Sequence, residues 1–368
     1  MPLLNKQVNY DILGAFIGAS EGTDYINHIP QLTRENIREV GNAILDYQPA
    51  KEAFYNSFLT KITRQLFENI NANNVFKFLK GPMTEGDIED AYIDYIKPQN
   101  FDGGETNPFT HNKPSIKVLY HKIDRQLKYK VTVSDTQLRK AFLSDTGLST
   151  LINKIVDTLT QSAEHDEYVM FKQLLADCYT KDANAKSVTL SGSSKAELVE
   201  KYLYELKKHS MNMTFNTRDY NKMGVLNRTS YDDQIIVMHK DYALDIDMGV
   251  LANTFNVDKM KLDGKVIIVD NFNKALPENA GNIVGCIFDR RGVRFWDSLR
   301  TMETLRNPDA LYTNYWLHIW QGLSYAYFHN MFFIIEPKEI EGEPEEEIEG
   351  EPEEPENDNS GNDNSGNN

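Results

Sequence analysis

Apolar residues recur every three or four positions in several stretches of the chain, the spacing that places them on one face of an α-helix. In the longest stretch, Leu148, Ile152, Ile155 and Leu159 form such a stripe. No proline interrupts it and no glycine follows Gly147, so one helix of roughly 50 Å fits there at 1.5 Å per residue. We expect helices over Thr33–Tyr47 (capped by Thr33), Ala50–Phe67, Thr146–Tyr179, Ser194–His209 and Met248–Phe255.

Other stretches alternate apolar and polar residues, which is the period-two pattern of a β-strand. The clearest are Ile116–Tyr120 and Tyr129–Val133. Just before the first runs PQNFDGGETNPFTHNKP (98–114), and a structureless segment of this length is unusual inside a compact domain, so we expect a projecting β-hairpin. Residues 1–32 show little periodicity and are expected to form an extended arm. The other expected strands, which make the fold class α+β, are Val75–Leu79, Ile88–Ile96, Gln234–His239, Lys265–Asp270, Ile283–Asp289 and Val293–Trp296.

Aromatic residues crowd into LYTNYWLHIWQGLSYAYFHNMFF, residues 311–333. A platform for stacked nucleic-acid bases needs Lys and Arg among the aromatics to contact the phosphates, yet residues 307–335 contain neither. Large side chains occupy both alternating sets of positions, which predicts strands that are buried on both faces. Gly322 and Ser324 predict a break between two such strands. We therefore interpret the segment as core and place Trp316 in it.

The composition is that of a folded protein, with 368 residues of which 40% are hydrophobic and 11% aromatic. No apolar run approaches the ~20 residues that span a bilayer. The first residues, MPLLNKQVNYDILG, lack the cluster of positive charges that precedes the apolar stretch of a signal peptide. The two cysteines, Cys178 and Cys286, indicate neither a disulfide framework nor a cysteine metal cluster. We expect synthesis in a reducing cytoplasm and no membrane partner.

The negative charge is concentrated at the end of the chain. Residues 336–368 carry −13 of the net charge of −16, which leaves −3 for the preceding residues. The same segment combines low hydrophobicity with repeated Pro and Gly, so it cannot bury enough surface to offset the entropy of ordering. We expect an acidic tail that is disordered from near Pro337.

A search for chemistry finds no GxGxxG, Walker A, HExxH, CxxC or GxSxG motif in the sequence. Of the weaker candidates, His165 and Asp166 lie within the long helix, where adjacent side chains point apart. Asp245 and Asp247 lie at an expected helix start, where carboxylates interact favourably with the helix dipole. The segment LSGSSK (190–195) lacks the glycine spacing of a phosphate loop, and one of its serines is explained as a helix cap. We predict no catalytic, cofactor-binding or metal site.

Several blocks of the sequence, taken in order, resemble the major capsid proteins of phi-29-like short-tailed bacteriophages. Two of them are RTSYDDQIIVMHKDYALDIDMGVLANTFNVDKMKLDGKVIIVDNF and METLRNPDALYTNYWLHIWQGLSYAYF. VGNAILDYQ, VLYHKIDRQLKYKVTVSDTQLRKAFLSD and SAEHDEYVMFKQLL fit the same pattern upstream. The resemblance covers about residues 35–335, and it is specific because distinctive blocks recur in order.

The resemblance implies the HK-97-like (Johnson) capsid fold, in which the elements expected above have defined places. The implied parts are the N-terminal arm and helices (1–70), the extended E-loop hairpin (71–135), the peripheral domain with its spine helix (136–220), the axial domain (221–298), the aromatic strands of the peripheral domain (299–335) and the acidic tail (336–368).

The function implied by the resemblance is structural. Many copies would assemble as pentamers and hexamers into an icosahedral virion shell that encloses the double-stranded DNA of a tailed phage without sequence-specific binding. A scaffolding protein and a portal are the expected partners. The alternative is an encapsulin-like nanocompartment shell, which DNA inside purified particles would exclude. An enzyme of unknown class is the rival of a different kind, and it would be active as an isolated subunit.

The acidic tail gives a first testable expectation. Packaged duplex carries about one negative charge per 1.7 Å of axis, so a tail of net −13 held inside would oppose filling. We expect it on the exterior and dispensable for assembly. A Glu-specific protease applied to intact, DNA-filled particles should remove it, as subunit mass measured afterwards would show. A tail that survives on intact shells but is cut from free subunits would place it inside.

Overall fold

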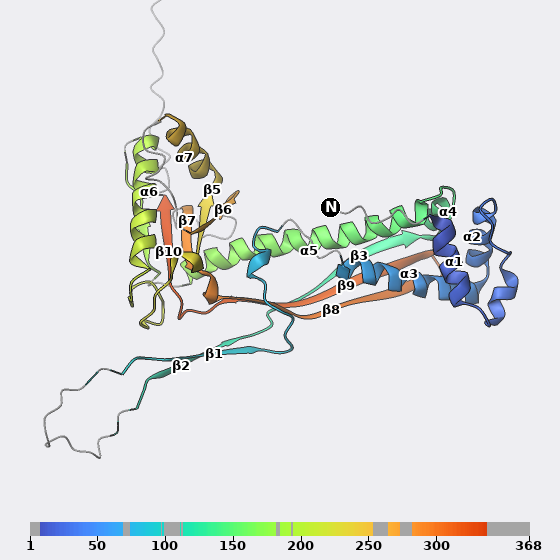
Figure 1. Ribbon diagram of the computed structural model, residues 1–368, viewed down its shortest axis with the longest axis horizontal. Coiled ribbons are helices and arrows are strands. Elements are labelled where there is room, and N and C mark those ends of the chain that lie inside the picture. The colour runs from blue at the N-terminus through green and yellow to red at the C-terminus, as the bar shows by residue number, and fades with distance from the viewer. Residues whose placement is uncertain are drawn as a thin grey trace, which may run out of the picture. The chain divides into compact units, whose positions relative to one another are not determined.

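By its internal contacts the chain divides into two units, Met1–Pro337 and Lys338–Asn368, and every described residue lies in the first. Most of segment 98–114 and all of the chain beyond Glu336 lie outside the described residues, together with the expectations made for them. The computed structural model (Figure 1) describes residues 8–68, 74–96, 98, 111, 113–181, 185–192, 194–252, 264–272 and 282–336.

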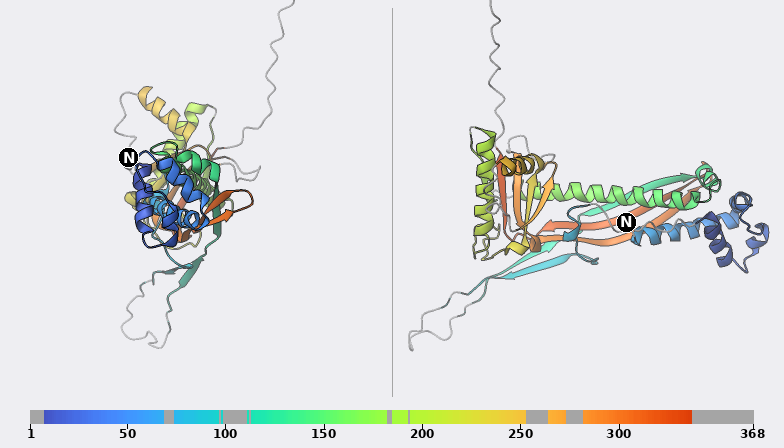
Figure 2. Two further views of the ribbon diagram at one scale, coloured as in Figure 1. Left: turned by 90° about the vertical axis from the view of Figure 1, so that its right-hand side faces the viewer. Right: turned by 45° about the horizontal axis from the view of Figure 1, so that its top comes forward.

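Three antiparallel strands form the sheet that contains most of the aromatic segment. Helix α5, Gly147–Thr180, lies along one face of this sheet (Figures 1 and 2), and its apolar stripe packs on Tyr315, Leu317 and Ile319. The long helix expected from the sequence is therefore confirmed. The strands, in the order β3-β9-β8, are Arg125–Ser134, Tyr312–Tyr325 and Val293–Asn307. The helices that complete this core are α1 (Asn9–Ala19), α2 (Ile37–Asp46), α3 (Gln48–Glu68) and α4 (Asp135–Ala141).

A five-stranded mixed sheet forms the second core. The last turns of α5 cover one of its faces through Phe171 and Leu175. Helices α6 (Lys195–Asn212) and α7 (Lys240–Ala252) cover the other, through Tyr202, Leu206 and Tyr242. Because α5 contributes to both cores, it ties the two sheets together. The strands, in sheet order, are β4 (Ser187–Thr189), β10 (Met331–Glu336), β7 (Asn282–Asp289), β5 (Gln234–His239) and β6 (Lys265–Val269).

The N-terminal region is more ordered than an extended arm. Instead of lacking structure, residues 9–19 form α1, whose Ile12, Leu13 and Phe16 are buried. The Asn9 amide, itself fully buried, donates to the carbonyl oxygens of Ala141 (2.8 Å) and Ser144 (2.7 Å) and accepts from the backbone N–H of Leu148. This side chain satisfies backbone groups at the start of α5, so the arm expectation is wrong for the described part of 1–32.

Four expected boundaries also differ from the structure. Helix α2 begins after Asn36, whose side chain accepts from the Thr33 N–H, so Thr33 is not its cap. Residues 75–79 form a turn and a short 3-10 helix instead of a strand, because Phe76 is buried by stacking on Phe171 at 4.2 Å. Helix α7 starts at Lys240, eight residues before the expected start at Met248. The strand expected to end at Trp296 continues as β8 to Asn307. A bulge between Asp297 and Leu299 shifts the alternation of apolar and polar residues there.

The aromatic segment also differs from the expectation of strands buried on both faces. In β9, Tyr315, Leu317 and Ile319 face α5 and are buried, whereas Trp316 is half-buried and Trp320 is 37% exposed on the opposite face. The strand runs through Gly322 without a break. Its end leads to β10, which pairs with β7 and β4 in the other sheet, so 299–335 do not form one group of strands.

Candidate interaction surface

A two-stranded ribbon, β1 (Ile88–Ile93) and β2 (Ile116–His121), forms its own antiparallel sheet (Figure 1). Its pairing aligns Ile93 with Ile116, Ala91 with Val118 and Glu89 with Tyr120. Successive residues of a strand point to opposite faces, so these six side chains share one face of the ribbon. The face is almost entirely apolar.

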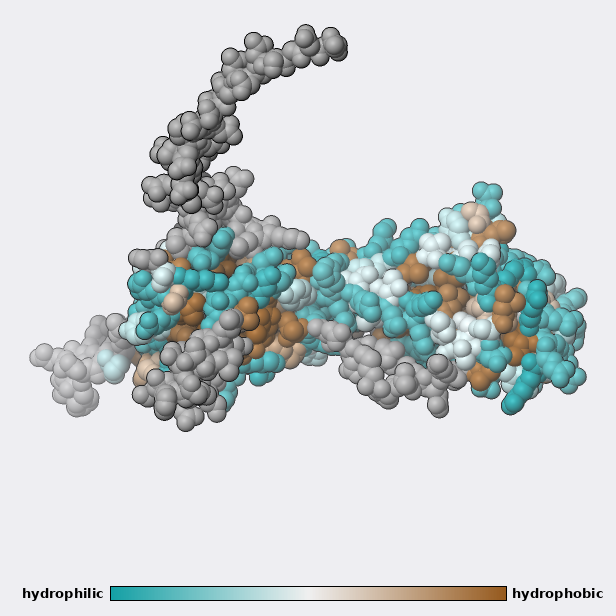
Figure 3. All heavy atoms as spheres, turned by 90° about the horizontal axis from the view of Figure 1, so that it is seen from above, coloured by the Kyte–Doolittle hydropathy of each residue, from teal (hydrophilic) through white to brown (hydrophobic). Residues whose placement is uncertain are grey.

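This apolar face of the hairpin is turned to solvent. The exposed fraction is 62% for Ile93, 60% for Ile116 and 66% for Tyr120. Tyr95, just beyond β1, is 71% exposed. Clustered apolar side chains at the surface of a soluble chain are typical of a site that binds another protein. On the face of the molecule in Figure 3, apolar patches lie among polar side chains. The ribbon is therefore the strongest candidate interaction surface among the described residues.

The opposite face of the ribbon contacts the body of the protein and mixes apolar with polar side chains: Ile88, Asp90, Tyr92, Lys117, Leu119 and His121. Asp90 receives two hydrogen bonds from the Arg294 guanidinium of β8, at 2.7 and 3.1 Å. His121 lies between Asp90 (3.1 Å) and the Ser324 hydroxyl of β9 (2.7 Å). Although burial opposes the charged form, the hydrogen bonds from His121 and Arg294 lower the pKa of Asp90 to about 2. The carboxylate is therefore charged at neutral pH and fixes the base of the hairpin.

The open face of the three-stranded sheet is a second exposed surface. Strand pairing places Lys130 beside Trp316, and its ammonium lies 5.8 Å from the centre of the indole ring. On the other side Trp316 pairs with Glu303 of β8. Basic residues thus reach the aromatics from a neighbouring strand, which the sequence argument overlooked because it considered only residues adjacent in the chain. The mixture of Lys and Glu does not form a basic groove.

A buried polar cluster joins α5 to the sheet beneath it. The Lys80 ammonium contacts Glu167 at 2.7 Å and Asp297 at 2.8 Å. The Gln321 amide donates to the same two carboxylates, at 2.6 and 2.8 Å. Each group in the cluster has a partner of complementary charge or polarity, so the arrangement ties residue 80 to α5, β8 and β9. Its role is structural.

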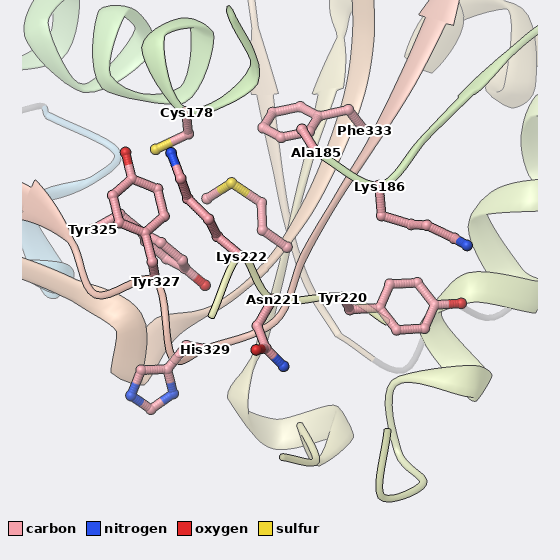
Figure 4. A pocket seen from close by; sticks show the side chains of 11 residues that line it. Cys178, Ala185, Lys186, Tyr220, Asn221, Lys222, Tyr325, Tyr327, His329 and Phe333 are labelled. Carbon is pink, nitrogen blue, oxygen red and sulfur yellow. The ribbon is translucent and has the colours of Figure 1, made fainter. Parts of the chain in front are cut away.

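The pocket in Figure 4 lies where the end of α5 meets the loops before β10. Its lining includes Cys178, Tyr220, Lys222 and His329, and it encloses about 20 Å³ of free space. This is room for about one water molecule. The pocket is therefore too small to hold an organic cofactor or substrate.

Three of the residues considered for chemistry, Asp166, Asp245 and Ser194, have structural partners. Asp166 accepts a hydrogen bond from the Tyr129 hydroxyl at 2.9 Å. Asp245 lies inside α7 and pairs with Lys195 at 3.0 Å, so its expected role at a helix start is wrong. Ser194 accepts from the Glu197 N–H at the start of α6, as expected. Within the described ranges, no group of three His, Cys, Asp or Glu side chains could hold a metal ion, and none of the helices there is long and apolar enough to cross a membrane.

Two solved structures superimpose on most of the chain. The chain superimposes on a capsid chain of Staphylococcus phage Andhra with a TM-score of 0.55, at 14% identity, over 72% of this chain and 84% of the other. For a chain from the head fiber and inner core protein structure of native bacteriophage P68 the TM-score is 0.57, at 14% identity, over 71% and 84%. The fold is the HK-97-like fold of phage capsid proteins.

Sequence comparison then specifies the family. Residues 16–335 match the Phi29-like phage major capsid proteins, and the chain belongs to this family. It is 31% identical over 324 residues to the major capsid protein of Bacillus phage PZA, which covers 86% of this chain and 70% of the relative. The major capsid protein of Streptococcus phage Cp-1 is 26% identical over 351 residues, or 89% and 94% of the two chains.

Family membership decides between the readings left open by the sequence. The protein is a major capsid protein that assembles with itself into the shell of a phage virion, and it is not an enzyme. The nanocompartment alternative is not favoured by these relatives. Sequence reasoning did not predict which face of the hairpin is exposed. Alternation predicted the strands, but it did not show that the apolar set faces solvent.

Proposed function

We propose that the shell built by this protein encloses the packaged double-stranded DNA of a tailed phage and is assembled in the host cytoplasm. A scaffolding protein and a portal are the partners that the family resemblance implies. The charge distribution supports confinement without adhesion, since residues 1–335 carry a net charge of only −3. A nearly neutral wall does not bind a polyanion strongly.

The elements receive roles within this proposal. The three-stranded sheet and α5 constitute the peripheral domain, with α5 as its spine. The five-stranded sheet with α6 and α7 constitutes the axial domain. It includes β4 and α6, which were expected in the peripheral domain (136–220), and β10, which sheet order separates from the aromatic strands β8 and β9. Residues 1–70 act as the N-terminal arm region, folded against α5 through α1 to α3. The E-loop (71–135) includes the hairpin β1–β2, whereas β3 at its end belongs to the three-stranded sheet.

The exposed apolar ribbon carries the proposal that the hairpin joins neighbouring copies. A two-stranded ribbon is marginally stable in water by itself, and this one docks the face that carries Asp90 and His121 on its own body. Its apolar face therefore has no partner among the described residues. A second copy of the chain is the partner that a self-assembling shell provides. Burial of Ile93, Ile116 and Tyr120 against that copy would remove their apolar surface from water.

Two measurements test the proposed function. Expression of the full chain, with and without a scaffolding protein, should yield closed shells in electron micrographs. Particles from infected cells should protect DNA from added nuclease, and mass spectrometry should identify this chain as their main component. Shells that contain protein cargo and no protected DNA would contradict DNA enclosure and favour the nanocompartment.

A further inference from the structure

The hairpin is attached to its own subunit by directional polar contacts at two points. The inner point is the Asp90–Arg294 fork, which joins β1 to β8. The outer point is a second fork, in which Arg218 donates to both oxygens of Asp94 at 3.1 and 3.0 Å. The two aspartates are four residues apart in an extended chain, or about 13 Å. Two attachments this far apart fix the direction of the hairpin relative to the body. A single attachment would let the hairpin swing about it.

The outer point rests on a loop that is itself well braced. Thr217 and Asn227 exchange two backbone hydrogen bonds of 3.0 Å that close the loop. The Asn221 side chain spans it, accepting from the Val225 N–H and donating to the Val225 carbonyl oxygen, both at 2.8 Å. Arg218 also donates to the Gly224 carbonyl oxygen at 2.8 Å. The guanidinium is therefore held in place before it binds the hairpin.

Tyr92 reinforces this outer attachment from the middle of β1. Its hydroxyl donates to the Leu226 carbonyl oxygen at 2.7 Å, and its ring stacks on Phe328 with 5.7 Å between centroids. Lys117, its partner across the ribbon, donates to the Met223 carbonyl oxygen. The face of the hairpin that carries Asp90, Tyr92 and Lys117 thus follows the loop, while its apolar face points away. The contacts that hold the ribbon in one orientation leave Ile93, Ile116 and Tyr120 exposed.

We propose that Arg218 and Arg294 are positioning residues for shell assembly: they fix the angle at which the hairpin presents its apolar face to the next copy. This inference rests on the proposed role of the hairpin in joining copies. A free hairpin would lose orientational freedom each time a contact formed, and prior attachment removes that cost. Every copy in a shell makes this contact. A small loss of binding free energy at each hairpin is therefore repeated throughout the assembly.

The forks should matter less for folding than for assembly. The Arg218 side chain is 45% exposed, and ion pairs in contact with solvent contribute little to stability. The apolar cores contain neither Arg218 nor Asp94. Bidentate geometry nevertheless gives a fork strong directional preference. The expected signature is a subunit that stays folded while its hairpin loses a fixed direction.

The test compares Arg218→Gln, Asp94→Asn and the double variant in the full chain, with Arg228→Gln, at the residue that follows the loop, as a matched control. We expect each single variant to lower the melting temperature by no more than about 3 °C and shell yield by about tenfold or more. The double variant should be no worse than either single one, because both remove the same fork. Arg228→Gln should leave shell yield unchanged.

A direct readout follows the hairpin itself. Spin labels at Val118→Cys and Asp232→Cys, measured in dilute subunits, should give a narrow distance distribution in the otherwise unchanged chain. The distribution should broaden when Arg218→Gln or Arg294→Gln is added. Unchanged distributions, or shell yields equal to those of the parent chain, would overturn the positioning role. Should Arg218→Gln unfold the subunit, Asp94→Asn, which keeps the size of its side chain, decides the outcome.

Failure of this inference can be distinguished from failure of the proposed function. If Ile116→Ser abolishes shells while the fork variants assemble normally, the hairpin joins copies but the forks do not position it. If Ile116→Ser assembles normally, the hairpin does not join copies and the proposal beneath this one is wrong. A double variant much worse than both singles would mean that Arg218 contacts the next copy directly, which also overturns a purely positioning role.

Discussion

Replacing Ile93, Ile116 and Tyr120 together with serine is expected to abolish shells while leaving the subunit folded. These side chains are more than half exposed in the subunit, so their removal takes little from its cores. Against a neighbouring copy, their burial contributes about 3 kcal/mol in total, or roughly a hundredfold in each contact. Sedimentation and electron microscopy of the expressed chain would measure the loss, and thermal unfolding would confirm that the subunit remains intact.

The matched control keeps the face apolar. Ile93→Val, Ile116→Val and Tyr120→Phe change size or remove a hydroxyl, but they leave most of the apolar surface in place. This triple variant should still form shells, although with reduced yield if packing at the contact is close. Normal shells from the serine variant would show that the hairpin face is not buried on assembly, whatever the valine variant does.

The same hairpin illustrates how far sequence patterns can lead. Alternation in Ile116–Tyr120 predicted a strand, and the structure confirms it as β2. Alternation alone does not say where the apolar set is buried. The usual assumption is that it faces the core of its own chain. Here the other set, Lys117, Leu119 and His121, faces the body instead, together with Asp90 of the paired strand. In a chain that assembles with copies of itself, part of the apolar surface can stay exposed in the subunit and contact a neighbouring copy.

Local signals predicted local structure well. Helix α5 and strand β5 match the expected ranges closely because the period of apolar residues within each element is enough to define it. What failed depended on contacts between distant residues. Asn9 contacts the start of α5 across more than 130 residues, and β10 leaves the aromatic strands to pair with β7. No periodicity within a short window encodes such partners.

The aromatic segment shows the same limit in its core residues. Trp296 of β8 is 2% exposed, and its ring occupies the space above Gly322 of β9. A Cβ at Gly322 would lie 2.2 Å from the ring, so glycine at this position is required by the tryptophan on the neighbouring strand. From the sequence, Gly322 predicted a break in the strand. In the structure it allows a large side chain to pack against an unbroken one.

Trp296→Ala should therefore cost about 3–5 kcal/mol of unfolding free energy, whereas Trp316→Ala should cost less than about 1.5 kcal/mol. Both remove an indole from the same sheet, but only Trp296 fills a closed space. Its indole N–H has no hydrogen-bond partner among the described residues, so the loss is one of packing. Urea unfolding of the full-length subunit would measure both values. Equal losses would mean that the open face of the sheet is covered within the subunit, and a larger loss for Trp316 would restore the original assignment of that residue to the core.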